Sequence, residues 1–102
     1  MLRFVPEVEE DVFAGYGWYE DKVFGLGEEF LRMFYACING IARNPLIYPK
    51  VYNNLRRCLL RRFPYAIYYT IENSDVIVFG LFHCARDPGT IITELQDRND
   101  SI

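Results

Sequence analysis

The spacing of apolar residues changes once along this chain, and that change constrains the fold more than any other feature. Before residue 44 apolar side chains recur every three or four positions, the period of an amphipathic helix, and after residue 54 the period is two, that of a strand. Helices followed by a run of strands are typical of an α+β domain. At 102 residues the chain is long enough for one core and too short for two.

Two amphipathic helices are predicted in the first part of the chain. Pro6 suits the first position of a helix, and the acidic residues that follow it favour a helix N-terminus. The apolar face of this helix consists of Val8, Val12, Tyr16, Tyr19 and Val23. After the glycine-containing segment 24–27, a second apolar face consists of Phe30, Met33, Phe34, Cys37 and Ile41. Pro45 disfavours helical geometry in the residue before it, so this helix should end near residue 43 and form an antiparallel hairpin with the first.

Four strands are predicted around this hairpin. Residues 2–5 are short and apolar and suit a first strand, and three more are predicted at 55–62, 65–72 and 76–83 as an antiparallel meander. The last is the most apolar and should be central and buried on both faces. The element order is therefore β-α-α-β-β-β, a two-layer α+β domain with the helical hairpin packed on one face of an antiparallel sheet.

The compact domain is expected to occupy residues 1–92, followed by a polar, frayed C-terminal tail at 93–102. No apolar run approaches the roughly 20 residues that span a bilayer. The N-terminus lacks the long apolar stretch of a secretory signal. We therefore expect a cytoplasmic protein that makes no contact with a membrane.

The cysteine and histidine content gives no metal signature. Cys37, Cys58 and Cys84 are widely spaced and His83 is the single histidine, whereas structural zinc sites usually take four such ligands at a recognisable spacing. We expect three buried cysteines that act as small apolar residues, with a redox or metal role as the alternative. Neither a metal nor another cofactor is expected.

Charge is segregated along the chain, although the formal net charge is only −3. Residues 1–29 hold eight acidic and two basic residues, whereas residues 43–62 hold six basic residues and no acidic one. Alternation along the strand at 55–62 divides its side chains into two sets, Arg57, Leu59 and Arg61 on one face and Arg56, Cys58, Leu60 and Arg62 on the other. The first set, with Tyr68 from the next strand, should lie on an open sheet face and meet an acidic partner. The alternative is a charged edge strand that only discourages aggregation.

Five fragments of the sequence occur in the order seen in one known superfamily. They are WYED at 18–21, GLGEEF at 25–30, NPLIYP at 44–49, RRCLLRRFPYAIYYTIE at 56–72 and HCARDP at 83–88. In this respect the chain resembles the RelE/ParE toxins of type II toxin–antitoxin systems, across roughly residues 3–90. The resemblance implies a small bacterial or archaeal toxin that is encoded beside an antitoxin, which wraps and neutralises it.

RelE-like members of this superfamily cleave mRNA in the ribosome. Cleavage needs groups that activate the 2′-hydroxyl, stabilise the phosphorane and protonate the leaving oxygen. The residues that could serve in this chain are Arg57, Arg61, His83 and Arg86. Leu59 and Ala66 stand where the resemblance leads us to expect Lys and Arg, so the catalytic set is incomplete.

ParE-like members act by binding and are associated with inhibition of DNA gyrase, and the fragments of this chain fit them better. Under that interpretation the partner-binding residues are Arg57, Arg61, Tyr68, Trp18 and Arg86. The partner is a cognate antitoxin, and gyrase is the implied target. The alternatives are the ribosome with its mRNA, for a RelE-like enzyme, and a non-toxic binding module of the same fold.

Several of the candidate site residues could instead have an ordinary structural role. Trp18 and Tyr19 would usually pack between helices, but an exposed Trp18 would become an antitoxin contact because Trp is enriched at binding hot spots. His83 would usually be packed or hydrogen-bonded at a strand end. Arg86 would usually form a local ion pair with Asp87.

Overall fold

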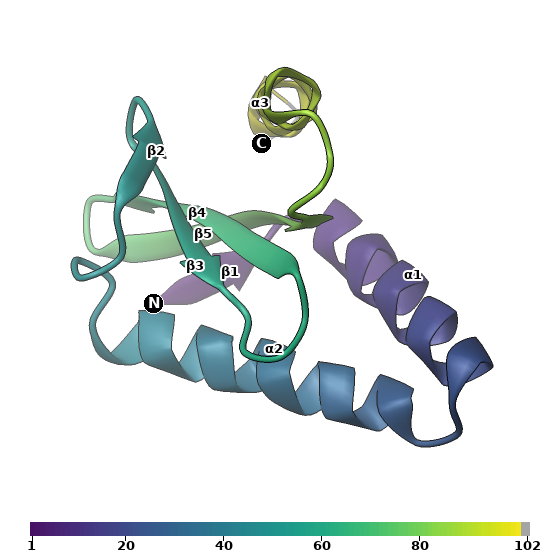
Figure 1. The fold of residues 1–102 in the computed structure, drawn as a ribbon. Coiled ribbons are helices and arrows are strands. Elements are labelled where there is room, and N and C mark those ends of the chain that lie inside the picture. Colours follow the sequence, from purple (N-terminus) through teal and green to yellow (C-terminus); the bar gives the residue numbers. More distant parts are fainter. Residues whose placement is uncertain (101–102) are drawn as a thin grey trace.

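A computed structural model describes the backbone of residues 1–100 and the side chains of residues 1–99 (Figure 1). The elements in chain order are β1 (Leu2–Phe4), α1 (Glu7–Lys22), α2 (Leu26–Arg43), β2 (Lys50–Tyr52), β3 (Leu55–Leu59), β4 (Tyr65–Glu72), β5 (Asp75–His83) and α3 (Pro88–Asp100). The α+β class, the helical hairpin and the meander formed by β3, β4 and β5 are confirmed. Elements β2 and α3 were not predicted.

The sheet has the strand order β1-β5-β4-β3-β2. All neighbouring strands are antiparallel except β1, which lies parallel to β5. Strand β5 therefore has a neighbour on each side, and every residue from Val76 to Phe82 is buried, as its apolar sequence predicts. One register shift interrupts the pairing of β4 with β5, between Tyr68 and Tyr69.

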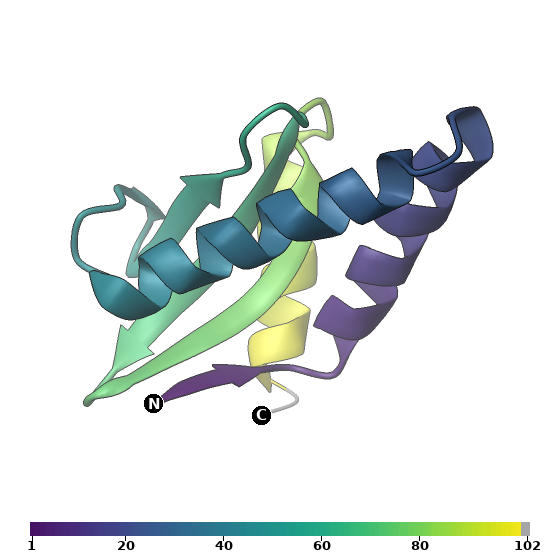
Figure 2. The same cartoon turned by 90° about the horizontal axis from the view of Figure 1, so that it is seen from below.

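Helices α1 and α2 form the hairpin, and α2 runs along one face of the sheet (Figures 1 and 2). Phe30, Phe34 and Ile41 of its predicted apolar face are all buried in the core. The short connection between the helices is fixed by Glu20 at the end of α1. Its carboxylate accepts hydrogen bonds from the backbone N–H groups of Gly25 and Gly27, which α2 would otherwise leave without partners at its N-terminus.

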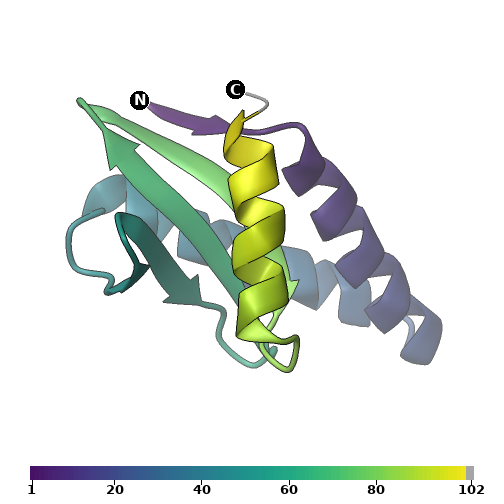
Figure 3. The same cartoon turned by 90° about the horizontal axis from the view of Figure 1, so that it is seen from above.

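Helix α3 lies on the opposite face of the sheet, where it crosses the strands (Figure 3). Ile91 and Leu95 are buried there, and Gly80 of β5 leaves room for the helix, because a Cβ at Gly80 would lie 2.7 Å from Arg98 Nη1 and 3.2 Å from Leu95 Cδ2. Asp87 Oδ2 caps the helix by accepting a hydrogen bond of 3.0 Å from the backbone N–H of Thr90. The frayed tail expected from residue 93 is therefore wrong for the described residues, which continue this helix.

Side chains of β3 and β4 donate hydrogen bonds to the segment between α2 and β3, and these bonds position the edge strand β2. Tyr69 Oη donates a hydrogen bond of 2.6 Å to the carbonyl oxygen of Pro45. Arg56 Nη1 donates to the carbonyl oxygens of Leu46, at 3.1 Å, and Tyr48, at 2.7 Å. Arg56 therefore has a structural role. Its hydrogen bonds order the segment between α2 and β3, which has no regular apolar spacing in the sequence.

The cysteines do not all behave as expected. Cys37 of α2 and Cys58 of β3 are buried, as predicted, but they form a disulfide that joins the helical layer to the sheet. Cys84 is exposed and free. The expectation of three buried apolar cysteines is therefore wrong for Cys84, and it missed the pairing of the other two.

Candidate binding surfaces

The structure brings three of the predicted site residues together in one groove. Trp18, His83 and Arg86 line a hollow of about 700 Å³ between α1 and the open end of the β4–β5 hairpin, where β4 begins and β5 ends. Tyr65 lines it as well, and we call this hollow the Trp18 groove. Arg57 and Arg61 do not line it, so the sequence-predicted set divides into two surfaces.

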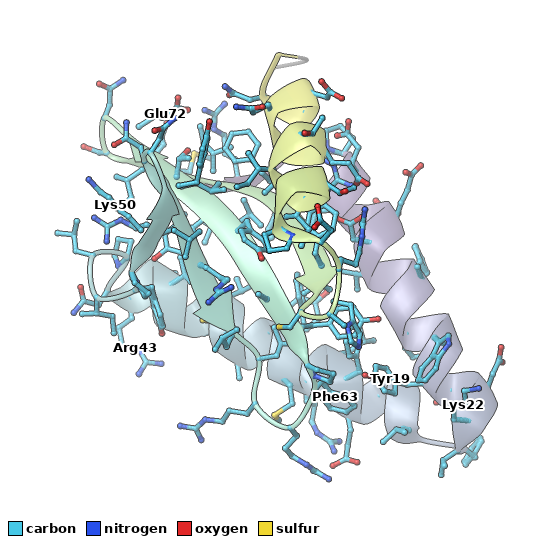
Figure 4. All side chains as sticks on the ribbon, turned by 45° about the horizontal axis from the view of Figure 1, so that its top comes forward. Tyr19, Lys22, Arg43, Lys50, Phe63 and Glu72 are labelled. Carbon is cyan, nitrogen blue, oxygen red and sulfur yellow. A yellow bond between two sulfur atoms is a disulfide. The ribbon has the colours of Figure 1, made fainter. Side chains whose placement is uncertain are left out.

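Aromatic side chains form much of the wall of the Trp18 groove. Tyr19 packs on Phe63 of the β3–β4 connection, with ring centroids 4.7 Å apart, where the end of α1 meets the sheet (Figure 4). Tyr65 lies within 5.1 Å of the His83 ring, and burial raises the pKa of its phenol. Burial is the main cause that also raises the pKa of Tyr19, and the second is repulsion from the Tyr65 phenol when that group is ionised. These phenols remain protonated at neutral pH and offer rings and hydroxyls, not proton acceptors.

Trp18 is exposed, which corrects the expectation that it packs between the helices. Its relative exposure is 55%, and its ring meets Tyr19 edge-on at 5.1 Å. Lys22 Nζ lies 4.6 Å from the centroid of the indole. An indole held open at the rim of a groove has the exposure that an interface contact requires.

His83 and Arg86 are both engaged in local structure. His83 Nδ1 accepts a hydrogen bond of 2.9 Å from the backbone N–H of Ala85, which leaves Nε2 as the nitrogen that can face the groove. Arg86 forms an ion pair with Glu94 of α3, and its guanidinium lies 4.9 Å from the Phe82 ring centroid. The expected pair of Arg86 with Asp87 is wrong, because Asp87 caps α3 instead.

The second surface consists of Arg57, Leu59 and Arg61, and we call it the β3 surface. Arg57 pairs with Tyr68 across the sheet and Leu59 pairs with Ala66, so both side chains lie on the face that α3 partly covers. Leu59 is 58% exposed and Arg61 is exposed in the turn that follows. Arg57 is half-buried. An exposed leucine beside the half-buried Arg57, with an exposed arginine in the turn that follows, suits a partner that combines apolar and acidic residues.

Tyr68 is not part of that exposed surface. Only 6% of it is accessible, and its ring packs on Phe82 at 5.9 Å beneath the region that α3 covers. The expectation of a half-open sheet face at this position is wrong, because α3 occupies it. β3 ends at Leu59, so Arg62 lies in the turn that follows and not on the strand as predicted; it forms an ion pair with Glu29 of α2, which holds this turn to the hairpin.

The residues considered for RNA cleavage are not gathered at one point. His83 pairs with Tyr65 at the start of β4 and lies on the side of the α1–α2 hairpin, whereas Arg57 pairs with Tyr68 and lies on the side of α3. On the β3 surface Leu59 pairs with Ala66, the two positions where the resemblance to RelE-like toxins leads us to expect Lys and Arg, and neither side chain is charged.

Two properties concern the part of the chain that the structure describes. No cluster of three or more Cys, His, Asp or Glu side chains there could hold a metal ion. No helix among the described residues is both long enough and apolar enough to cross a membrane.

The fold defines a class of small α+β proteins in which a helical hairpin covers one face of a mostly antiparallel sheet. Comparison with protein families matches residues 2–88 to the family described as ParE toxin of type II toxin-antitoxin system, parDE. Among solved structures, the chain is similar to one from P. aeruginosa described as a chromosomal ParDE TA system. The TM-score is 0.60 at 15% identity, over 80% of this chain and 92% of that one. Comparison with curated protein sequences gives no match.

This chain belongs to the ParE toxin family of type II toxin–antitoxin systems. The match covers most of the domain, from β1 to the first residue of α3. The resemblance inferred from the five fragments is thus confirmed at the level of the family.

Proposed function

We propose that this chain inhibits growth by binding its target and not by catalysis, and that a cognate antitoxin neutralises it. The observation that carries the proposal is the pairing of Leu59 with Ala66 on the β3 surface. The resemblance to RelE-like toxins implies Lys and Arg at these two positions, and the apolar side chains found there can neither stabilise the developing charge nor transfer a proton. The separation of His83 from Arg57 on opposite sheet faces supports the same conclusion.

The β3 surface is the proposed contact with an acidic segment of the antitoxin. Arg57 and Arg61 would pair with its carboxylates while Leu59 packs against its apolar residues, and the exposed Trp18 would provide a second contact. Arg57→Ala and Arg61→Ala should each weaken antitoxin binding in a calorimetric titration. Arg43→Ala, which removes an exposed arginine at the end of α2, is the matched control. Unchanged affinity in both β3 variants would exclude the proposed contact.

DNA gyrase is the proposed target, and a supercoiling assay with purified toxin tests it directly. Loss of supercoiling that the antitoxin restores would support the proposal, and unaffected supercoiling at toxic concentrations would reject gyrase. The enzymatic alternative is tested by ribosome toe-printing, in which new mRNA ends would reveal cleavage. If induction without the antitoxin is harmless, the chain is a binding module and not a toxin.

A further inference from the structure

The segment that joins α2 to β2 is ordered by contacts on its inner side, yet it turns two large aliphatic side chains into solvent. Arg56 of β3 binds it through the carbonyl oxygens of Leu46 and Tyr48. The Tyr48 hydroxyl reaches the last turn of α2, where a Cβ at Gly40 would lie 2.5 Å from it. Leu46 is nevertheless 68% exposed, and its neighbour Ile47 is 63% exposed. Because this backbone is ordered before any partner binds, the two side chains are preorganised for a contact.

The exposed apolar surface continues on the edge strand β2. All three residues of this strand are exposed, and Val51 is 40% exposed. The Tyr52 hydroxyl accepts a hydrogen bond of 3.4 Å from Gln96 of α3, so this ring is engaged with the C-terminal helix. Folding gains little from apolar side chains that remain in water, and a cluster of them usually marks an interaction site. We call this region the β2 surface, and it consists of Arg43, Leu46, Ile47, Lys50 and Val51.

The charge of the β2 surface is positive. Arg43 ends α2 and Lys50 begins β2, and both are exposed at the same end of the molecule, opposite to Lys22 (Figures 1 and 4). Neither Arg43 nor Lys50 forms an ion pair with another described residue. The sequence contains no Asp or Glu between positions 30 and 71. Two cations beside aliphatic side chains suit a partner that combines carboxylates with apolar residues.

The β2 surface fits a protein segment better than a nucleic acid or a second copy of this chain. Its apolar side chains, Leu46, Ile47 and Val51, are aliphatic, whereas proteins that bind single-stranded nucleic acid stack the bases on aromatic rings. Two copies of the surface would bring like charges together. Lys50 on the edge and the irregular pairing with β3 between Lys50 and Tyr52 also discourage the addition of a partner strand. The partner should therefore bind through side chains.

We infer that the β2 surface binds the target of this toxin, through a segment of the target protein that carries acidic side chains beside apolar ones. The inference rests on the proposed function. It deepens it by separating the surface that binds the target from the surface that binds the antitoxin. A toxin that acts by binding needs a contact surface that is complete in the free toxin, and the β2 surface is ordered and exposed without a partner.

The position of the β2 surface also gives neutralisation a physical basis. The backbone N–H of Arg57, on the β3 surface, donates to the carbonyl oxygen of Pro49, next to Lys50, at 3.1 Å. The two surfaces therefore adjoin. An antitoxin segment bound to the β3 surface would stand where a protein on the β2 surface needs room, so the antitoxin and the target would exclude one another.

The test compares inhibition of gyrase supercoiling by purified variants of the full chain. The double variant Leu46→Ala/Ile47→Ala should raise the half-inhibitory toxin concentration at least about tenfold, and Lys50→Glu should raise it about fivefold. Val23→Ala and Lys22→Glu make similar changes at exposed residues of the opposite end and should inhibit like wild type. Antitoxin affinity and the unfolding midpoint should be unchanged in every variant, because the substituted side chains are exposed and lie outside the β3 surface.

Induction in cells that lack the antitoxin extends the test to any target. Wild type and both control variants should arrest growth, whereas the double variant and Lys50→Glu should lose this effect. Arrest at the wild-type level by both would overturn the inference and leave the proposed function intact. Weakened antitoxin binding with growth arrest retained would assign the surface to the antitoxin, and retardation of DNA that Lys50→Glu abolishes would assign it to nucleic acid.

The proposed function fails in a different way from the inference. A harmless wild-type chain would reject the proposed function and, with it, the inference. Unaffected supercoiling, together with growth arrest that only the β2-surface variants lose, would reject gyrase as the target and support the β2 surface as the contact with another protein.

Discussion

Asp11 of α1 and Arg98 of α3 form a bidentate ion pair between residues 87 positions apart in the sequence. Arg98 Nη1 donates to Asp11 Oδ2 at 2.6 Å, and Arg98 Nη2 donates to Asp11 Oδ1 at 3.0 Å. The pair is tied to β5 as well, because Nη1 also donates to the carbonyl oxygen of Phe79 and Oδ2 accepts from the backbone N–H of Leu81. One interaction thus holds both α1 and α3 to β5.

Removing one partner of this pair should be strongly destabilising. Arg98→Ala leaves the Asp11 carboxylate largely buried without its cation, a change that costs roughly 3 kcal/mol in comparable pairs. Urea unfolding measures the loss in the free energy of unfolding. Arg86→Ala is the control, since it breaks the more exposed pair with Glu94 and should cost less than about 1 kcal/mol. Equal losses in the two variants would contradict the role given to the Asp11–Arg98 pair.

Glu20 should contribute to stability by capping α2 from the end of α1. Glu20→Ala removes the acceptor for the N–H groups of Gly25 and Gly27 and should lower the free energy of unfolding by about 1–2 kcal/mol. Thermal unfolding monitored by circular dichroism measures the change. Asp21→Ala alters an exposed acid beside it and should have little effect. A Glu20 variant as stable as wild type would show that solvent satisfies these N–H groups equally well.

Local patterns were sufficient to predict the elements that carry long apolar stripes. The buried face of α2 and the continuously buried β5 follow from their sequences. Apolar residues at a period of 3.6 can be buried together only on one face of a helix, and a short unbroken apolar run is typical of a strand buried on both faces. Alternation along β3 likewise placed Arg57 and Leu59 on one face, which the register confirms. The edge strand β2 has three exposed residues, so it carries no burial pattern that could be predicted.

Helix α3 was missed because its burial depends on tertiary partners. Among its described side chains, Ile91 and Leu95 are the two buried apolar ones, and the acid that holds its arginine belongs to α1. This error also placed Tyr68 on an open face that α3 in fact covers. The exposure of Trp18 could not be predicted either, because a tryptophan on a helix is compatible with core and with interface alike.

Alkaline pH should destabilise the protein partly through Tyr69. Burial is the main cause that raises the pKa of this phenol to about 12, whereas an unfolded tyrosine titrates near 10. The folded state therefore retains a proton that the unfolded state loses, so the stabilisation is present below pH 10 and is lost as the pH rises towards 12.

Tyr69→Phe should reduce that alkaline loss of stability by up to about 1.4 kcal/mol per pH unit between pH 10 and 12. It should also cost roughly 1 kcal/mol at neutral pH, because the hydrogen bond to Pro45 is removed. Urea unfolding from pH 8 to 11 measures both effects. Some pH dependence should remain, since the pKa values of Tyr19 and Tyr65 are raised too. Identical slopes for variant and wild type would exclude Tyr69 as a contributor.

Two glycines of α1 provide an internal comparison of packing against helix propensity. Gly15→Ala would place a Cβ 2.5 Å from Phe30 Cζ at the closest contact of the hairpin, whereas a Cβ at Gly17 meets nothing within 4 Å. Alanine is favoured over glycine within a helix by about 1 kcal/mol, so Gly17→Ala should be stabilising by up to that amount. Overpacking costs about 1–3 kcal/mol, so Gly15→Ala should be neutral to destabilising. Chemical unfolding of both variants measures the sign, and equal stabilisation in the two would mean that Phe30 moves aside at negligible cost.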